Sequence, residues 1–87
     1  MNHELKCWPS FFQAVWDGRK TFEIRKDDRG FQAEDTVTLL EYEPGTWPKN
    51  PGLTGRKIGA RIGYVTAYEQ KPGYCVFALF SLNNIKA

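Results

Sequence analysis

The chain has 87 residues, of which 41% are hydrophobic and 15% aromatic. This length allows one domain with one modest core, and this composition excludes an intrinsically disordered chain. The net charge of +2 excludes a strong whole-molecule field, so electrostatic recognition depends on how the charges are distributed. No apolar run approaches the roughly 20 residues of a membrane span, and the N-terminal segment lacks a signal peptide's apolar run. We therefore expect a cytoplasmic protein, without membrane attachment, with a single domain over residues 1–87.

The N-terminal part of the chain predicts a strand followed by a helix. Residues 3–7 read as a short strand and residues 9–17 as a helix, because Pro9 suits the first helical turn and Gly18 suits the position just past the end. Apolar side chains recur at helical spacing, which predicts that they share one face directed at the core. These side chains are Trp8, Phe12, Val15 and Trp16, with Phe11 widening the stripe.

The next segment, "KTFEIRK" at residues 20–26, alternates between apolar and polar side chains. This period of two predicts a half-buried strand. We expect Phe22 and Ile24 to face the core, which places Glu23 and Arg25 on the opposite face.

The rest of the chain predicts three more strands and one long loop. Residues 36–42 and 56–68 read as strands, and residues 74–82 read as an apolar last strand buried on both faces. Between the first two of these strands, residues 44–55 form a loop rich in proline and glycine that carries Trp47. The order β-α-β-β-loop-β-β predicts an α+β fold, a small mixed or antiparallel β-barrel with one main helix packed against it.

Charges are unevenly distributed along the chain. Residues 18–29 and 56–71 are rich in lysine and arginine, whereas residues 32–43 carry four acidic residues and no cation. If the two basic segments converge in the fold, they form a local patch that attracts phosphate.

The basic segment 18–29 contains the sequence "GRKTFEIR", which fits the pattern G-x-K-x-x-E-x-R at Gly18, Lys20, Glu23 and Arg25. In this context, after an aromatic-rich helix and before "FQAEDTVTL", the chain resembles the ASCH domain family, a family of PUA-like β-barrels. It looks especially like a small bacterial and phage branch of unknown function. The resemblance is strong over residues 3–43 and weaker over the strands that follow.

The resemblance implies a PUA-like barrel that binds RNA or a nucleotide in a cleft with the signature on its floor. Some small members of that family are amide hydrolases acting on acylated cytidines, through a Lys and a Thr of the motif region and a Glu from elsewhere. Here Lys20 matches the lysine, but Glu23 stands at the threonine position, which puts the hydrolase nucleophile in doubt. We expect Lys20, Glu23 and Arg25 to line one cleft beside the helix end; a structural ion-pair network is the alternative reading.

Outside the motif, several residues are candidates with two readings each. Trp47 either stacks on a base or tucks under its loop, and Tyr68 either lines the cleft or lies at a strand end. Arg61 either binds phosphate with Arg25 or is solvated. Glu69 is a weak candidate for a second catalytic carboxylate. Tyr64 is expected in the core.

His3, Cys7 and Cys75 give no zinc-ligand set, so we expect no metal and no cofactor. His3 reads as an ordinary surface residue, and Cys75 as a buried thiol.

Three functions remain open. The first is an RNA-binding or nucleotide-binding module. Its expected binding residues are Gly18, Lys20, Glu23, Arg25, Trp47, Arg61 and Tyr68. The second is a small hydrolase, acting on modified cytidines or as a ribonuclease, with Lys20 and Glu23 as its catalytic pair. The third is a phage or host accessory module that binds another protein.

Overall fold

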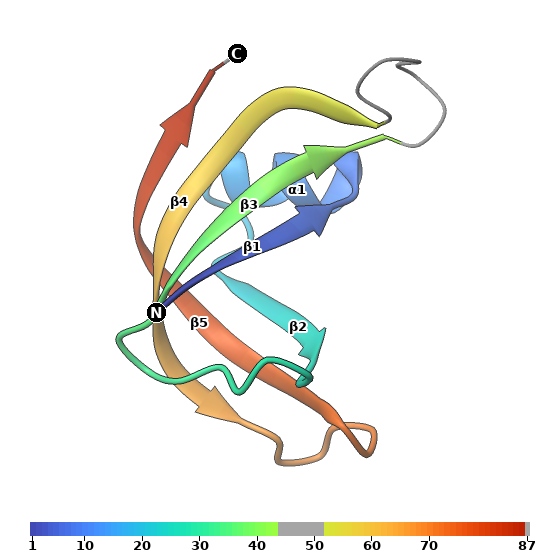
Figure 1. The fold of residues 1–87 in the computed structure, drawn as a ribbon, viewed down its shortest axis with the longest axis vertical. Helices are drawn as coiled ribbons and strands as arrows, with labels where there is room; N and C mark the ends of the chain where they lie inside the picture. Colours follow the sequence, from blue (N-terminus) through green and yellow to red (C-terminus); the bar gives the residue numbers. More distant parts are fainter. Residues whose placement is uncertain (44–51, 87) are drawn as a thin grey trace.

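The computed structural model describes residues 1–43 and 52–86, whose five strands form one sheet curled into a half-barrel around a short helix (Figure 1). The elements are β1 (Asn2–Cys7), α1 (Pro9–Trp16), β2 (Phe22–Lys26), β3 (Thr36–Tyr42), β4 (Leu53–Thr66) and β5 (Tyr74–Ile85). The strand order is β1-β3-β4-β5-β2, with β1 parallel to β3 and the other three pairs antiparallel. The expected α+β class, with a small barrel-like mixed sheet and one helix, is confirmed at this level.

The end of α1 determines how the chain enters β2. Gly18 adopts a left-handed conformation with φ of 79°, which an L side chain rarely tolerates. The backbone N–H groups of Arg19 and Lys20 then both donate to the Ala14 carbonyl, at 2.9 and 3.0 Å. The helix therefore stops sharply, and Lys20 is held two residues before Phe22, the first residue of the following strand.

The core lies between α1 and the inward face of the sheet. Phe12 and Val15 are fully buried, as the helical spacing predicted, and Trp16 packs against them. The inward residues of the strands alternate along each strand, as a pleated sheet requires. They are Leu5 and Cys7 of β1, Val37 and Leu39 of β3, Ile58, Ala60 and Ile62 of β4, and Cys75, Phe77 and Leu79 of β5.

The prediction that Trp8 lies in the core is wrong. Trp8 is 61% exposed, and Phe11 is 58% exposed. The helix begins at Pro9, and Trp8 has an extended backbone with φ of −61° and ψ of 148°, so helical spacing does not apply to it. Phe11 is on the helix but lies outside the face formed by Phe12 and Val15.

The prediction for the faces of β2 is also wrong. The hydrophobic pattern placed Phe22 and Ile24 in the core, and the structure has the opposite face inward. Phe22 and Ile24 are 42% and 53% exposed, whereas Glu23 is buried. Glu23 pairs with Phe77 of β5, and Arg25 pairs with Cys75, so both charged residues share the inward face with core residues. Burial of the Glu23 carboxylate is tolerated because two cations neutralise it, as described below.

In the second half of the chain, a change of register moves Tyr64 outward. The ladder between β4 and β5 shifts between Ile62 and Val65, and Val65 rather than Tyr64 packs against the core. Tyr64 is consequently 76% exposed, which corrects its expected place in the core. The strand β5 also alternates, with outward residues such as Phe80 partly exposed, so it is not buried on both faces.

His3 is buried, contrary to the expected surface position. Its Nε2 is hydrogen-bonded to Asp35 Oδ2 at 2.9 Å, and its ring centroid lies 4.8 Å from that of Phe31. The hydrogen bond from His3 is the main reason that the pKa of Asp35 is lowered. The two cysteines, Cys7 and Cys75, are both buried free thiols.

Candidate functional site

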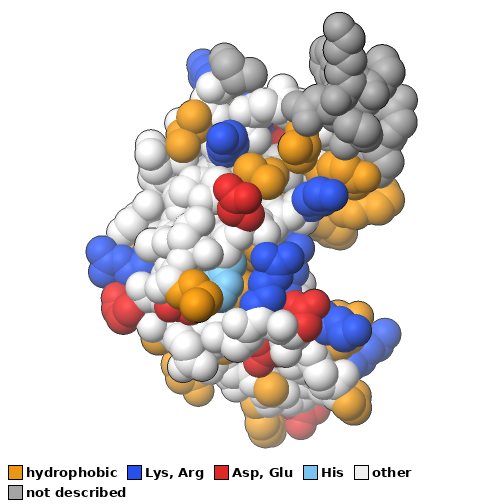
Figure 2. All heavy atoms as spheres, viewed as in Figure 1, with side chains coloured by type: hydrophobic (Ala, Val, Ile, Leu, Met, Phe, Trp, Pro, Cys, Tyr) orange, Lys and Arg blue, Asp and Glu red, His pale blue; other side chains and the backbone are white. Residues whose placement is uncertain are grey.

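The strands β1 and β2 are the two edges of the sheet, and a pocket opens between them beneath α1. Figure 2 shows the hollow at the right margin of the molecule, with lysine and arginine side chains on its border. The pocket has a volume of about 340 Å³, which is at the small end of ligand pockets. Its lining residues are Lys6, Cys7, Trp8, Phe11, Lys20, Glu23, Ile24 and Arg25.

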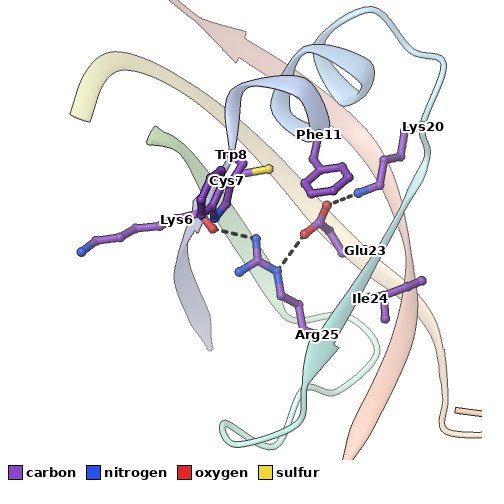
Figure 3. A pocket seen from close by; sticks show the side chains of 8 residues that line it. All are labelled: Lys6, Cys7, Trp8, Phe11, Lys20, Glu23, Ile24 and Arg25. Carbon is purple, nitrogen blue, oxygen red and sulfur yellow. Dashed lines mark hydrogen bonds and ion pairs between the residues drawn. The ribbon is translucent and has the colours of Figure 1, made fainter. Parts of the chain in front are cut away.

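Glu23 is the centre of a charged cluster on the floor of this pocket (Figure 3). Its carboxylate, 4% exposed, accepts a hydrogen bond from Lys20 Nζ on one oxygen and from Arg25 Nε on the other, the latter at 2.8 Å. Lys20 and Arg25 are themselves 18% and 24% exposed. One buried anion therefore holds two partly buried cations, and the cluster carries a net charge of +1.

The local structure explains why these three residues meet. The turn at Gly18 delivers Lys20 to the start of β2, and the strand alternation then points Glu23 and Arg25 inward on the same face. The expected juxtaposition of the three charged residues in one cleft is thus observed, although on the face opposite to the one predicted. Gly18 itself does not line the pocket and acts through the backbone turn.

Arg25 also joins the two edges of the sheet. Its Nη2 donates to the carbonyl oxygen of Lys6 in β1 at 2.9 Å, and Arg29 Nη1 donates to the carbonyl oxygen of Glu4 at 2.8 Å. We call this region, where arginine side chains of the β2 side reach backbone carbonyls of β1, the seam. Figure 3 shows the Lys6 side chain directed away from the pocket, so Lys6 contributes its backbone rather than its ammonium.

Two aromatic side chains form the wall above the cluster. Trp8 and Phe11 line the pocket and are more than half exposed. Lys20 Nζ lies 5.8 Å from the ring centroid of Phe11 and 5.2 Å from that of Phe22, within the range of cation–π attraction. Sequence reasoning assigned Trp8 to the core; the proline directly after it, which starts the helix, was the signal that Trp8 stands outside the helical stripe.

Cys7 lies in the pocket wall but is not an activated thiol. The pKa of its thiol is raised to about 11, mainly by burial and secondarily by the negative charge of Glu23. The positive charges of Arg25 and Lys20 lower this pKa, but by less than burial and Glu23 raise it. At neutral pH the group is therefore protonated and behaves as a small apolar side chain.

The other candidate residues lie away from this pocket. Arg61 is on the outer face and contacts Glu34 Oε1 at 3.2 Å, and Tyr68 lies beyond the end of β4 and is 78% exposed. Glu69 borders a second depression together with Lys71. Trp47 lies outside the described residues.

A second buried ion pair was not anticipated from the sequence. Glu41 of β3 accepts hydrogen bonds from Arg56 Nη2 at 2.8 Å and from Thr54 Oγ1 at 2.6 Å, and Arg56 Nη2 also donates to Gln13 of α1. The hydrogen bond from Arg56 is the main reason that the pKa of Glu41 is lowered. The Arg56 guanidinium stacks 4.6 Å from the ring of Trp16, so this cluster ties α1 to the sheet.

Across residues 1–43 and 52–86, the structure has no group of three or more His, Cys, Asp or Glu side chains arranged to hold a metal ion. In the same part of the chain, no helix has the length and apolar character that crossing a bilayer requires.

Comparison with known proteins assigns the family. Residues 2–79 match the model of a family described as "Domain of unknown function (DUF3850)". The chain belongs to the DUF3850 family. The matched segment includes the whole pocket with its charged cluster, so the site belongs to the DUF3850 part of the chain.

A curated relative comes from a bacteriophage, which confirms the expectation of a phage connection. This DUF3850 chain is 41% identical over 64 residues to a protein of Escherichia phage P2 described as "Uncharacterized 12.9 kDa protein in GpA 3'region". The alignment covers 74% of the chain and 53% of the phage protein, so the chain spans about half the length of the curated relative that it matches.

Proposed function

We propose that the pocket between β1 and β2 binds a nucleotide, either free or as one unit of an RNA chain. The observation that supports this most directly is that one small cavity is lined by both cationic and aromatic side chains. Lys20 and Arg25 lie on the floor and the half-exposed rings of Trp8 and Phe11 form the wall. The cations can bind a phosphate, and the aromatic rings can stack on a base.

The electrostatics of the floor favour an anionic ligand. Glu23 neutralises one of the two cations, and the remaining net charge of +1 lies in a partly desolvated site. A guanidinium has five N–H donors and an ammonium has three. The contacts with Glu23 and with the Lys6 carbonyl use only part of this capacity, so donors remain for a ligand oxygen. The cavity volume suits one nucleotide rather than a duplex.

The proposal extends to the family relationship. We propose that this DUF3850 chain is an ASCH-type, PUA-like barrel. The pattern of Gly18, Lys20, Glu23 and Arg25 supports this, because its three charged members form one hydrogen-bonded cluster on the floor of a cleft. The curled mixed sheet with one helix is compatible with such a barrel.

The geometry favours binding over hydrolysis. Both oxygens of Glu23 already accept hydrogen bonds from cations, which weakens the group as a general base. The thiol in the wall, Cys7, is protonated at neutral pH because its pKa is raised to about 11. The hydrolase function of Lys20 and Glu23 is therefore our second proposal, and a protein partner is the third.

Titration of the protein with nucleoside 5′-monophosphates, by calorimetry or by NMR at low salt, tests the first proposal. Losing one charge-assisted hydrogen bond costs about 1.5 to 3 kcal/mol, so Arg25→Met weakens binding by about 10-fold or more. Trp8→Ala weakens it through lost stacking. Lys86→Met is the matched control, because Lys86 is an exposed lysine outside the pocket.

Absence of binding at low salt, or binding that Arg25→Met leaves unchanged, contradicts the proposal. Incubation with acylated cytidines and with labelled RNA tests the second proposal. Turnover that disappears in Glu23→Gln, while circular dichroism shows that the variant is still folded, favours the hydrolase.

A further inference from the structure

The outer face of β2, β5 and β4 is a second surface with an unusual composition. These three strands lie side by side in the sheet (Figure 1). Large apolar side chains on them are between 39% and 76% exposed, and most are aromatic. They are Phe22 and Ile24 of β2, Tyr64 of β4, and Tyr74, Phe80 and Ile85 of β5. An apolar surface of this kind marks an interaction site.

The sheet register shows that this surface is continuous. Phe22 lies opposite Ala78 of β5, two residues from Phe80 along the same strand. Such diagonal neighbours on adjacent strands are about 7 to 8 Å apart. The two phenylalanine rings therefore stand on one face at a spacing that successive unstacked bases can span.

Gly63 makes room for one of these rings. A Cβ at this position would lie 2.9 Å from the Phe80 ring, closer than real contacts allow. The ring of Phe80 thus lies across the β4 backbone, where a side chain would otherwise stand, and remains 39% exposed. An exposed ring held against backbone in this way presents its surface to a ligand instead of packing in a core.

The charges that the three strands place on this face have one sign. The only acidic residue in the three strands is Glu23, which points inward. Lys26 and Lys57 are exposed, and Arg61 lies opposite Phe80 with its guanidinium carbon 5.2 Å from the ring centroid. Two carboxylates from outside the strands lie nearby: Glu34 approaches Arg61 at the surface, and Glu69 lines a depression together with Ile24 and Tyr74. Cations beside exposed aromatic rings are complementary to a polyanion with flat bases.

We propose that the outer face of β2, β5 and β4 binds single-stranded nucleic acid. Bases stack on Phe22 and Phe80, and phosphates contact Lys26, Lys57 and Arg61. Sheets that carry exposed aromatic residues bind unstacked bases in this manner. The surface adjoins the pocket along β2, where Ile24 lines both and Lys20, next to Phe22, borders both. The remaining aromatic side chains and cations of the outer face lie outside the pocket, so this proposal does not depend on the proposed nucleotide site.

The test compares a fluorescent oligonucleotide of about twelve uridines with uridine 5′-monophosphate, using the full chain. Removing one stacking ring, in Phe80→Ala, weakens oligonucleotide affinity by about 5- to 100-fold. Removing one phosphate contact, in Lys26→Gln, lowers the slope of log affinity against log salt by about 0.7. Monophosphate binding is unchanged in both variants. A thymidine oligonucleotide of equal length shows whether the 2′-hydroxyl contributes.

Two results would overturn the inference. One is oligonucleotide binding that is lost in Arg25→Met but unchanged in Phe80→Ala and Lys26→Gln, which assigns all binding to the pocket. The other is a dimer in light scattering that dissociates in Phe80→Ala, with no oligonucleotide binding, which assigns this face to a second copy of the chain. Oligonucleotide binding without monophosphate binding supports the outer face while contradicting the nucleotide pocket, so the two proposals fail separately.

Discussion

Replacing Glu23 by glutamine removes the anion that holds Lys20 and Arg25 in place, and we expect a large loss of stability. The glutamine oxygen can accept from one cation, but its amide group turns N–H donors toward the other. Breaking a buried ion pair by removing one partner costs about 3 to 5 kcal/mol. Because Lys20 and Arg25 are about one-fifth exposed, water can partly replace the lost contact, and we expect a loss of about 2 to 4 kcal/mol.

This loss is large relative to the total free energy of unfolding of a chain this size, roughly 4 to 13 kcal/mol. Urea unfolding followed by tryptophan fluorescence measures it, with an unchanged m-value showing that the two folded states expose similar surface on unfolding. A cost below about 0.5 kcal/mol for Glu23→Gln would refute the reasoning, because the carboxylate would then not be holding two desolvated cations.

A triple replacement separates stability from function at the same site. Lys20→Met, Glu23→Leu and Arg25→Met together exchange the ionic cluster for apolar side chains of similar size. Buried ionic clusters exchanged in this way are often no less stable than the original. We expect unfolding free energy within about 1 kcal/mol of the wild type, but no nucleotide binding. A triple variant as unstable as Glu23→Gln would indicate that the charges are needed for the fold itself.

Three further predictions concern other parts of the molecule. The pKa of Cys7 is raised from 9.0 to about 11 in the folded state. The stability that the protonated thiol contributes is therefore fully present below about pH 9 and is lost as the pH rises to about 11. Between pH 9 and 11, the free energy of unfolding should therefore fall by about 2 to 3 kcal/mol more in the wild type than in Cys7→Ala. If the unfolding free energies of the two proteins depend equally on pH, the raised pKa of Cys7 is contradicted. In the wild type the pKa of Glu41 is below its ordinary 4.5. In Arg56→Met it should rise above that value in an NMR titration, because desolvation by burial then outweighs the remaining hydrogen bond from Thr54. A pKa still below 4.5 would contradict this. Gly63→Ala should displace the Phe80 ring and weaken oligonucleotide binding, as measured by fluorescence anisotropy. Urea unfolding should show a stability cost of about 1 kcal/mol or less. Unchanged oligonucleotide affinity would argue that bases do not stack on the Phe80 ring.

The sequence predicted the elements of the fold well because their signals are local. The strand at residues 36–42 has the predicted bounds, and the helix begins at Pro9 and stops before Gly18 as capping preferences indicate. The strand β4 begins three residues earlier than predicted and β5 ends three residues later, since the paired residues Asn83 and Asn84 give no apolar signal.

The faces of β2 were predicted with the wrong sign because alternation gives a period and not a direction. The hydrophobic choice put Phe22 and Ile24 inside, but a carboxylate with two cationic partners can be buried and an edge strand can leave apolar side chains outside. Pairing between Glu23, Lys20 and Arg25 depends on three-dimensional contacts that a hydrophobicity pattern does not record.

The candidate site was predicted in its charged part and missed in its aromatic part. The spacing of the motif was sufficient to bring Lys20, Glu23 and Arg25 together, because all three lie within one turn and one strand. Trp8 and Phe11 reach the same pocket from a different element, and their position follows from how α1 sits over the gap between β1 and β2. That relation is set by long-range packing.

The arginine contacts at the seam also bear on how copies of the chain behave toward one another. An edge strand with unpaired carbonyl groups is a template for pairing with a strand of another molecule. At the edge of β1, the carbonyl groups of Glu4 and Lys6 are occupied by the guanidinium groups of Arg29 and Arg25. These long, charged side chains cover the edge without adding a strand, which keeps the barrel open to a ligand while discouraging edge-to-edge aggregation at high protein concentration.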